Sequence, residues 1–272
     1  MIVLVTDSSA LLTREEAREW GVRVVPLSYA VAGRPFLETY SGENGDFLTL
    51  LSKGQPAHTS QPAPGVYLSV FDEITRQGGE VLCLTISSRL SGAYGSAMAA
   101  ARELSDRNIT VFDSRTAGGG LFLMVQQAAM MVKEGLSVSE IVEKLYELRD
   151  KIFIAFSVSD LTPLHQGGRV GRIRQSINTI LNNRPLFLCR DGAIVSDGIA
   201  RGKTAQQDYL FYRVPSGARQ IIVHHAGKES NTALELAARL RAAHPKAKVS
   251  VRLLGPVLTI HLGLSALCVV WL

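Results

Sequence analysis

Apolar runs alternate with helix-like segments along the first half of the chain. The runs at residues 2–6, 22–29, 81–86 and 109–112 have the length and composition of strands, and Pro26 predicts an edge or a bulge in the second one. Two helices are predicted to begin at capping boxes, at residues 13–16 and 137–140, and three more are predicted at 46–53, 96–104 and 121–134. A further helix is predicted to begin at Pro64, and its apolar stripe consists of Val66, Val70, Phe71 and Ile74. Strands separated by helices favour an α/β domain over residues 1–150, with a mostly parallel sheet and helices on both faces.

The second half of the chain has a different pattern. Two apolar runs, 185–189 and 194–199, flank Asp191-Gly192, which is a strong signal for a β-hairpin. Further strands are predicted at 152–158, 221–224, 248–254 and 266–272, with an amphipathic helix at 232–243. A hairpin mixed with helices predicts an α+β domain over residues 151–272, with a mixed, partly antiparallel sheet.

Composition narrows the class of protein. The chain has 272 residues, 46% hydrophobic and 19% charged, which is typical of a globular protein with a large core. Its formal net charge is +5, but the basic residues are spread along the chain, so we expect no nucleic-acid partner. This modest excess favours an anionic ligand or an acidic partner surface.

The cysteines and the two ends of the chain indicate the cellular compartment. Cys83, Cys189 and Cys268 lie in apolar runs without a C-x-x-C motif, so we expect reduced core thiols. The apolar stretches at the two ends are too short for a signal peptide or a transmembrane segment. We therefore expect a cytoplasmic protein.

A hydroxyl-rich turn at residues 87–94 joins a predicted buried strand to a predicted helix. The N-terminus of a helix offers unpaired N–H groups and a partial positive charge, which suit an anion. The turn contains no Cys, His or carboxylate that could attack a substrate. Ser91 is the central hydroxyl, and the simpler interpretation is that it caps the helix.

Other polar loops follow first-half strands. Asp7 and Ser8 follow the first strand, and Ser114 follows another. Because the carboxyl ends of parallel strands share one edge, these residues and Ser91 are predicted to cluster there, although each could be an ordinary turn or cap. A separate loop, Thr59-Ser60-Gln61-Pro62, is stiffened by prolines and could hold a hydroxyl at a fixed point, or simply connect two elements.

Basic and imidazole groups occur in the second half. Arg169 lies in a glycine-rich basic segment at 167–172, and Arg201 and Lys203 follow the hairpin. Arginine can pair with a carboxylate or a phosphate, but a solvated basic loop explains these residues equally well. His261 is a lone histidine in an apolar run, a setting more typical of a core residue than of a ligand contact.

Several familiar motifs are absent. Gly202-Lys203-Thr204 looks like the end of a P-loop, but position 197 is Asp rather than the required Gly. No strand leads into G-x-G-x-x-G, no G-x-S-x-G elbow exists, and the histidines lack metal-ligand spacing. The residues alone therefore indicate a hydroxyl-lined, mildly basic anion site. An esterase or phosphatase using Ser91 or Asp7, or a sensor of another small anion, remain alternatives.

Six motifs together resemble the DegV family, which includes the fatty-acid-binding subunits of bacterial fatty acid kinase. They are, in order, Thr6-Asp7-Ser8-Ser9, Thr59-Ser60-Gln61-Pro62, residues 87–94, Asp113-Ser114, Gly167-Gly168-Arg169, and Gly255-Pro256 with His261, Gly263 and Ala266-Leu267. The resemblance runs from the first strand to the last. It implies two α/β domains with a long-chain fatty acid held between them.

The resemblance also implies roles for particular residues. Thr59, Ser91 and His261 bind the acyl carboxylate, and Ser60, Gly92, Asp7, Ser8 and Ser114 support the site loops. Arg169 and Arg201 lie near the head group or the partner, and the acyl chain enters an apolar tunnel in the second domain. The implied partner is an ATP-dependent kinase that phosphorylates the presented carboxylate. The chain itself has no catalytic residues, metal or cofactor, and a transient contact with a membrane surface stays open.

One segment departs from the family pattern. The family commonly has His-Thr-Gly-Pro-Gly where this chain has His261-Leu262-Gly263-Leu264-Ser265. The missing Thr and Pro-Gly could alter the loop around His261, whereas Thr59 and Ser91 are intact.

Overall fold

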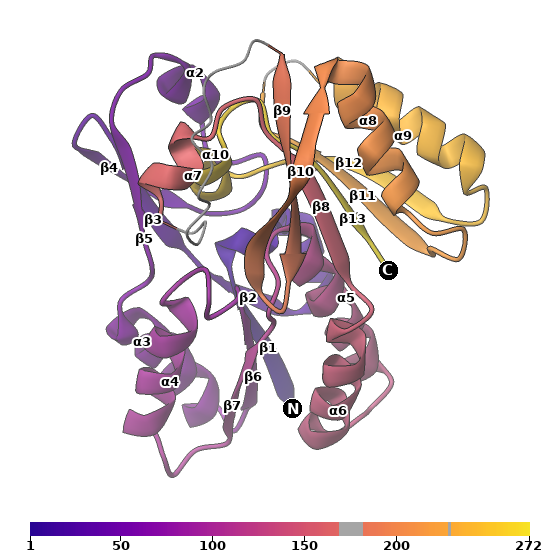
Figure 1. Ribbon diagram of the computed structural model, residues 1–272. Helices are drawn as coiled ribbons and strands as arrows, with labels where there is room; N and C mark the ends of the chain where they lie inside the picture. The colour runs from indigo at the N-terminus through magenta and orange to yellow at the C-terminus, as the bar shows by residue number, and fades with distance from the viewer. Residues whose placement is uncertain (169–181, 228–229) are drawn as a thin grey trace. The chain divides into compact units, whose positions relative to one another are not determined.

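A computed structural model describes residues 1–168, 182–227 and 230–272 (Figure 1). The chain divides into two compact units. The first unit comprises Met1–Gly45 and Pro56–Lys151, and the second comprises Asp46–Gln55 and Ile152–Leu272. Arg169, one of the predicted basic residues, lies outside the described residues.

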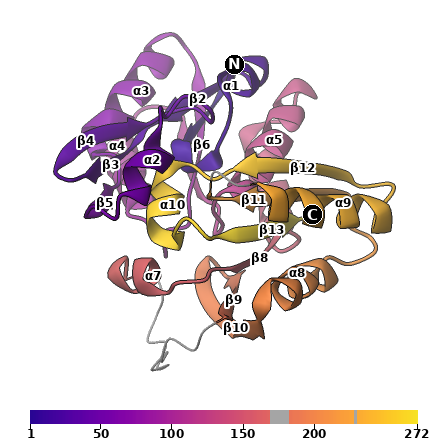
Figure 2. The ribbon, with the colours of Figure 1, turned by 90° about the horizontal axis from the view of Figure 1, so that it is seen from above.

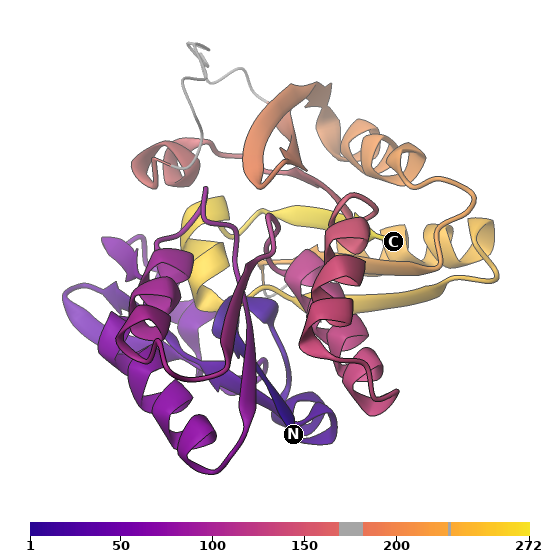
Figure 3. The same cartoon turned by 90° about the horizontal axis from the view of Figure 1, so that it is seen from below.

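The first unit is built on a parallel sheet. Its strands β1 (Ile2–Asp7), β2 (Val22–Val25), β6 (Glu80–Thr85) and β7 (Ile109–Asp113) pair in the order β2-β1-β6-β7, all parallel. Helices α3 (Pro64–Arg76) and α4 (Ala93–Glu103) cover one face, and α5 (Gly119–Lys133) and α6 (Val138–Arg149) lie side by side on the other (Figure 1, Figure 3). The predicted parallel, doubly covered sheet is confirmed.

Both predicted capping boxes are confirmed. Thr13 accepts from the N–H of Glu16 at the start of α1 (Arg14–Trp20), and Ser137 accepts from the N–H of Glu140 at the start of α6. In each, the glutamate also accepts from the backbone N–H of the cap residue. The predicted apolar stripe of α3 was wrong at one position: Val66 is 40% exposed, whereas Tyr67, Phe71 and Ile74 are buried.

The predicted single strand over residues 22–29 was wrong. The structure has two strands there, β2 and β3 (Leu27–Val31), in different sheets and separated by Pro26. Proline has no N–H to donate and restricts the backbone, so the chain leaves the parallel sheet at this residue. β3 then pairs antiparallel with β4 (Arg34–Glu38) and with β5 (Ala57–Ser60).

The second unit has a mixed sheet in the order β10-β9-β8-β13-β11-β12. Its strands are β8 (Phe153–Ser157), β9 (Asn183–Arg190), β10 (Ala193–Arg201), β11 (Gln220–His225), β12 (Lys248–Leu253) and β13 (Leu267–Trp271). β11 and β12 are parallel and the other pairs are antiparallel. The predicted hairpin is confirmed as β9–β10. Asp191 and Gly192 have φ of 47° and 74°, as a two-residue hairpin turn with left-handed residues requires.

Helices α8 (Gly202–Arg213) and α9 (Asn231–Ala243) cover one face of this mixed sheet (Figure 1, Figure 2). Leu210 of α8 and Leu236 of α9 are fully buried against Val223 and Val269 of the sheet. The unit also contains the short helices α2 (Phe47–Ser52), α7 (Thr162–Gln166) and α10 (Pro256–Leu262). The predicted partly antiparallel sheet is therefore confirmed, whereas α8 was not predicted.

The predicted reduced thiols and the predicted lack of a transmembrane segment can be compared with the structure. All three cysteines are free thiols; Cys83 and Cys268 are buried and Cys189 is half-buried. Burial raises the pKa of the Cys268 thiol to about 12, so this group stays protonated. No helix in the described part of the chain is both long enough and apolar enough to cross a bilayer.

Candidate functional site

The parallel sheet of the first unit has a switch point between β1 and β6. From β1 the chain passes outward to β2, and from β6 it passes outward to β7 on the other side. The loops after β1, β6 and β7 therefore leave from one edge of the sheet, which is where ligands bind in open α/β sheets. These loops carry the predicted residues Asp7, Ser8, Ser91 and Ser114.

Asp7 ties the two central strands together at this edge. Its Oδ1 accepts from the N–H and the hydroxyl of Ser9 at 3.1 and 2.5 Å, and its Oδ2 accepts from the N–H of Ile86 at 2.8 Å. The side chain is fully buried, and this burial raises the pKa of its carboxyl group. All of these bonds are internal, so Asp7 shapes the loops.

Ser8 and Ser114 are also buried and hydrogen-bonded internally. The Ser8 hydroxyl donates to Oε2 of Glu38 at 2.8 Å and accepts from the N–H of Leu27 at 3.0 Å. The Ser114 hydroxyl donates to the carbonyl of Thr116 at 3.3 Å and accepts from its N–H at 3.2 Å. Both hydroxyls thus hold the backbone at the sheet edge.

Ser91 occupies the turn that leads into α4. Its backbone N–H donates to the carbonyl of Ser87 at 3.1 Å, and its Oγ accepts from the N–H of Ala93 at 3.2 Å. The residue is half-buried, and the N-cap of α4 is Gly92, where no side chain caps the helix. Ser91 therefore precedes the cap, and its hydroxyl keeps its own hydrogen to donate to an acceptor.

The Thr59 loop touches the Ser91 turn. Thr59 lies on β5, pairs with Tyr29 of β3 and is half-buried. Ser60 ends β5 and is exposed. A Cβ atom on Gly92 would lie 2.9 Å from Nε2 of Gln61, so a larger residue at position 92 would displace the Gln61 side chain. The two hydroxyl motifs that carried the family resemblance are thus in contact through Gln61 and Gly92.

His261 lies in the last turn of α10, in the second unit. Its imidazole packs against Gly167, where a Cβ atom would lie only 2.5 Å from Nδ1. Two hydrogen bonds hold the segment that follows it, which differs from the family pattern. The N–H of Gly263 donates to the carbonyl of Thr259, and Oγ of Ser265 accepts from the N–H of Ser159. Gly263 has φ of 82°, a conformation that suits glycine.

Arg201 ends β10 and is the N-cap residue of α8, where its exposed side chain makes no capping bond. It pairs with Asn183 across the hairpin. Arg169 lies outside the described residues, so its predicted place near Arg201 stays a prediction.

Sequence reasoning assigned no role to Gln61 or Gly167. Gln61 belongs to the Thr59-Ser60-Gln61-Pro62 motif. The sequence feature that indicates its contact is the glycine at position 92, because a residue without a side chain leaves room for the Gln61 amide. Gly167 was placed in a glycine-rich basic segment, yet its φ of −68° is helical. Gly167 matters because it has no side chain, which leaves room for the imidazole of His261. Among the described residues, no group of His, Cys, Asp and Glu could hold a metal ion.

Comparison with protein families gives a match over the whole chain. The family model described as "Uncharacterised protein, DegV family" matches residues 1–272. A DegV domain-containing protein from Halalkalibacterium halodurans is 31% identical over 277 residues, covering 99% of this chain and 98% of that protein.

Solved structures are similar over the same extent. A DegV family protein from Thermus thermophilus, described as fatty acid binding, is 30% identical, with a TM-score of 0.88 over 99% of this chain and 98% of that one. A stearic-acid-binding protein from Eubacterium ventriosum is 26% identical, with a TM-score of 0.86 over 100% of this chain and 98% of the other.

Proposed function

This chain belongs to the DegV family, and on that premise we propose that it binds a long-chain fatty acid and presents the acyl carboxylate to a partner kinase. The observation that carries the proposal is the contact between the Thr59 loop and the Ser91 turn, made through Gln61 and Gly92. The likeness to fatty-acid-binding relatives from Thermus thermophilus and Eubacterium ventriosum supports it.

The carboxylate is bound by hydroxyl donors in this proposal. Thr59 and Ser91 donate to the carboxylate oxygens, and His261 completes the network. The N-terminus of α4 adds a partial positive charge, because the peptide dipoles of the helix are aligned. A carboxylate that leaves water needs such donors to replace its lost hydration.

The acyl chain supplies most of the affinity. Burial contributes about 0.8 kcal/mol per methylene, so a sixteen-carbon tail contributes roughly 12 kcal/mol before the cost of ordering it. We place this tail in an apolar tunnel of the second domain. The hydroxyl groups then determine where the carboxylate is held.

Phosphorylation of the carboxylate is assigned to the partner. Asp7 is fully buried with internal donors only, which argues against its use as a nucleophile. A kinase would bring ATP and Mg²⁺, and Arg201 and Arg169 would offset the negative charge that grows on the transferred phosphoryl group. The chain is therefore a carrier that presents its substrate.

Mass spectrometry of ligand extracted from denatured, purified protein tests the binding role. We expect a long-chain fatty acid at close to one per chain. A protein that is purified empty and also fails to bind added palmitate would overturn the proposal.

A second experiment tests the kinase role. The loaded protein is incubated with ATP, Mg²⁺ and a candidate kinase from the same organism, and acyl phosphate is trapped with hydroxylamine. Hydroxamate should form only when both proteins are present. Formation by this chain alone would make it an enzyme in its own right.

A further inference from the structure

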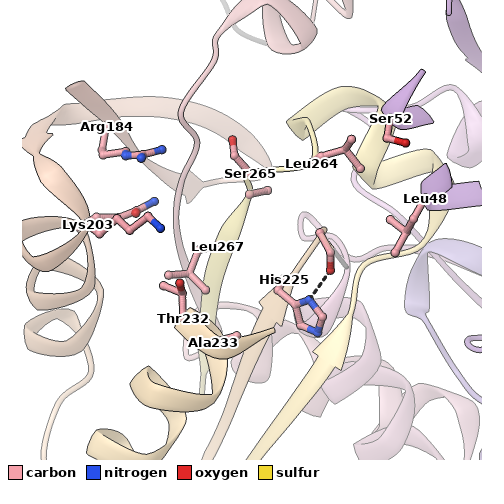
Figure 4. Close-up of a pocket in the computed structure, with 13 residues that line it drawn as sticks. Leu48, Ser52, Arg184, Lys203, His225, Thr232, Ala233, Leu264, Ser265 and Leu267 are labelled. Carbon is pink, nitrogen blue, oxygen red and sulfur yellow. Dashed lines mark hydrogen bonds between the residues drawn. The ribbon is translucent and has the colours of Figure 1, made fainter. Parts of the chain in front are cut away.

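A pocket in the second unit lies at the end of the mixed sheet where two helices begin. Its volume is about 440 Å³, within the range of roughly 300–1,000 Å³ that is usual for small-molecule sites. It is lined by Leu48, Ser52, Arg184, Lys203, Gln206, His225, Gly227, Thr232, Ala233, Leu264, Ser265, Ala266 and Leu267. Figure 4 shows Arg184 and Lys203 on one side of it and Leu48 and Ser52 on the other.

The pocket lies on the α8/α9 face of the sheet. Leu267 lines the pocket and also belongs to the core beneath α8 and α9. Arg184 faces the same side, because it stands an even number of residues from Leu188 of that core along β9. Arg201, which pairs with Asn183, faces the opposite side. Thr59, Ser91 and His261, the residues assigned to the acyl carboxylate, are not among the residues that line the pocket.

The charged residues among the described lining residues are cationic. The side chains of Arg184 and Lys203 have no ion-pair or hydrogen-bond partner among the described residues, and Nε of Arg184 is a buried donor. None of the described lining residues is an aspartate or a glutamate. An unpaired cation at a partly enclosed site favours a bound anion, because the anion replaces the hydration that the cation loses.

Two helices point their N-termini into this region. Lys203 is the second residue of α8, and Thr232 is the second residue of α9. Neither terminus has a side-chain cap, and each carries a partial charge of about +0.5. α9 lies between the parallel strands β11 and β12, and an uncapped helix N-terminus of this kind suits an anion.

Gln206 of α8 adds a polar group to the pocket. The residue is only 4% exposed, yet it lines the pocket. Its side chain has no hydrogen-bond partner among the described residues, and its amide atoms are not fully buried. The amide is therefore able to donate to a polar ligand group or accept from it.

We propose that this pocket binds the phosphate group of a small phosphate monoester. Two full cations and two helix termini supply enough positive charge to compensate the charge of −1.5 to −2 that a phosphate monoester carries at about pH 7. Leu48, Leu264 and Leu267 line the rest of the pocket and leave an apolar wall for the carbon part of the ligand. Burial lowers the pKa of His225 from its ordinary value, and the hydrogen bond between its Nδ1 and the carbonyl of Gly227, at 3.0 Å, acts in the opposite direction.

Calorimetric titration tests the site with three probes: inorganic phosphate, glycerol 3-phosphate and glycerol. We expect saturable binding of both phosphate probes and none of glycerol. Tighter binding of glycerol 3-phosphate would identify an ester as the ligand class, and equal binding would identify the free oxyanion. Absence of binding of both phosphate probes at ~10 mM, well above a Kd of ~1 mM, would overturn the proposal.

A matched pair of variants locates the binding. Lys203→Gln should weaken phosphate binding about tenfold or more. Lys248→Gln removes the same charge at an exposed position of β12 outside the pocket, and should change the affinity less than twofold. An equal loss of phosphate affinity in both variants would mean that phosphate is attracted by the overall charge of the protein, and would overturn the assignment to this pocket.

Competition with palmitate separates this site from the proposed acyl site. Phosphate should bind equally well to the delipidated and the palmitate-loaded protein. Displacement of phosphate by palmitate at one to one would assign the pocket to the fatty acid and overturn a separate phosphate site. Failure of the protein to bind palmitate at all would overturn the proposed function and leave the phosphate titration unaffected.

Discussion

The imidazole of His261 rests directly on the backbone of Gly167. A Cβ atom at Gly167 would lie 2.5 Å from Nδ1 of His261 and 3.2 Å from the carbonyl oxygen of Pro163. Gly167 has an ordinary helical backbone, with φ of −68° and ψ of −19°, so glycine is needed there for space and not for conformation. This contact places the imidazole relative to the end of α7.

Gly167→Ala should therefore act through His261. The added methyl group pushes the imidazole aside without straining the backbone, and fatty acid affinity should fall about tenfold, or ~1.4 kcal/mol. Palmitate titration measures it. Gly217→Ala is the control, because no atom lies within 4 Å of its Cβ position.

A double-mutant cycle checks this mechanism. In a His261→Ala background, Gly167→Ala should cause no further loss of affinity, since the ring that it displaces is gone. Additive losses would show that Gly167 acts by some other route.

Ser91→Ala tests the carboxylate contact. Loss of a hydrogen bond to a charged group costs about 1.5–3 kcal/mol, so palmitate should bind at least ten times more weakly. Ser88→Ala is the control in the same turn, because the Ser88 hydroxyl donates to Oδ2 of Asp113 at 2.5 Å. Unchanged affinity in Ser91→Ala would remove Ser91 from the carboxylate site.

Asp7→Asn should reduce the stability of the first unit. An amide nitrogen in place of one oxygen would face either the N–H of Ile86 or the Ser9 donors, leaving a buried donor unpaired. The expected loss is about 1–3 kcal/mol in the free energy of unfolding, measured by urea titration. Asp106→Asn, an exposed change beside Arg107, should stay within about 0.5 kcal/mol. Equal stabilities would argue against Asp7 as the tie between β1 and β6.

Buried His224 predicts a pH dependence of stability. Burial, with the nearby charge of Arg252, lowers the pKa of His224 to about 3. Below the unfolded value of about 6.5, the unfolded chain binds a proton that the folded chain does not, so acidification favours unfolding. This residue should contribute a loss of ~1.4 kcal/mol per pH unit below pH ~6.5.

Urea titrations at several pH values between the two pKa values measure this dependence. The His224→Gln variant should show a shallower slope than the wild-type protein over this range, whatever its stability at neutral pH. An unchanged slope would show that other groups carry the acid sensitivity.

Local signals in the sequence predicted much of the architecture. The capping boxes, the Asp191-Gly192 hairpin and the alternation of strands with helices each depend on residues a few positions apart. Such patterns are readable because short-range hydrogen bonds and side-chain periodicity determine them. Pro26 was noticed, yet its effect was underestimated, because the strand after it joins a sheet whose partners are distant in sequence.

The roles of individual polar residues depended on tertiary partners. Ser8, which the pattern placed in an anion site, donates to Glu38, 30 residues away, and Asp7 accepts from Ile86, 79 residues away. The pocket combines Leu48 from an early helix with Lys203 and His225 from the second half of the chain. The sequence by itself determined the family and the order and type of most main elements, but not α8 or the separate sheet β4-β3-β5. Only the tertiary structure decided which polar groups are satisfied internally and which remain for a ligand, because that depends on long-range contacts that no local pattern encodes.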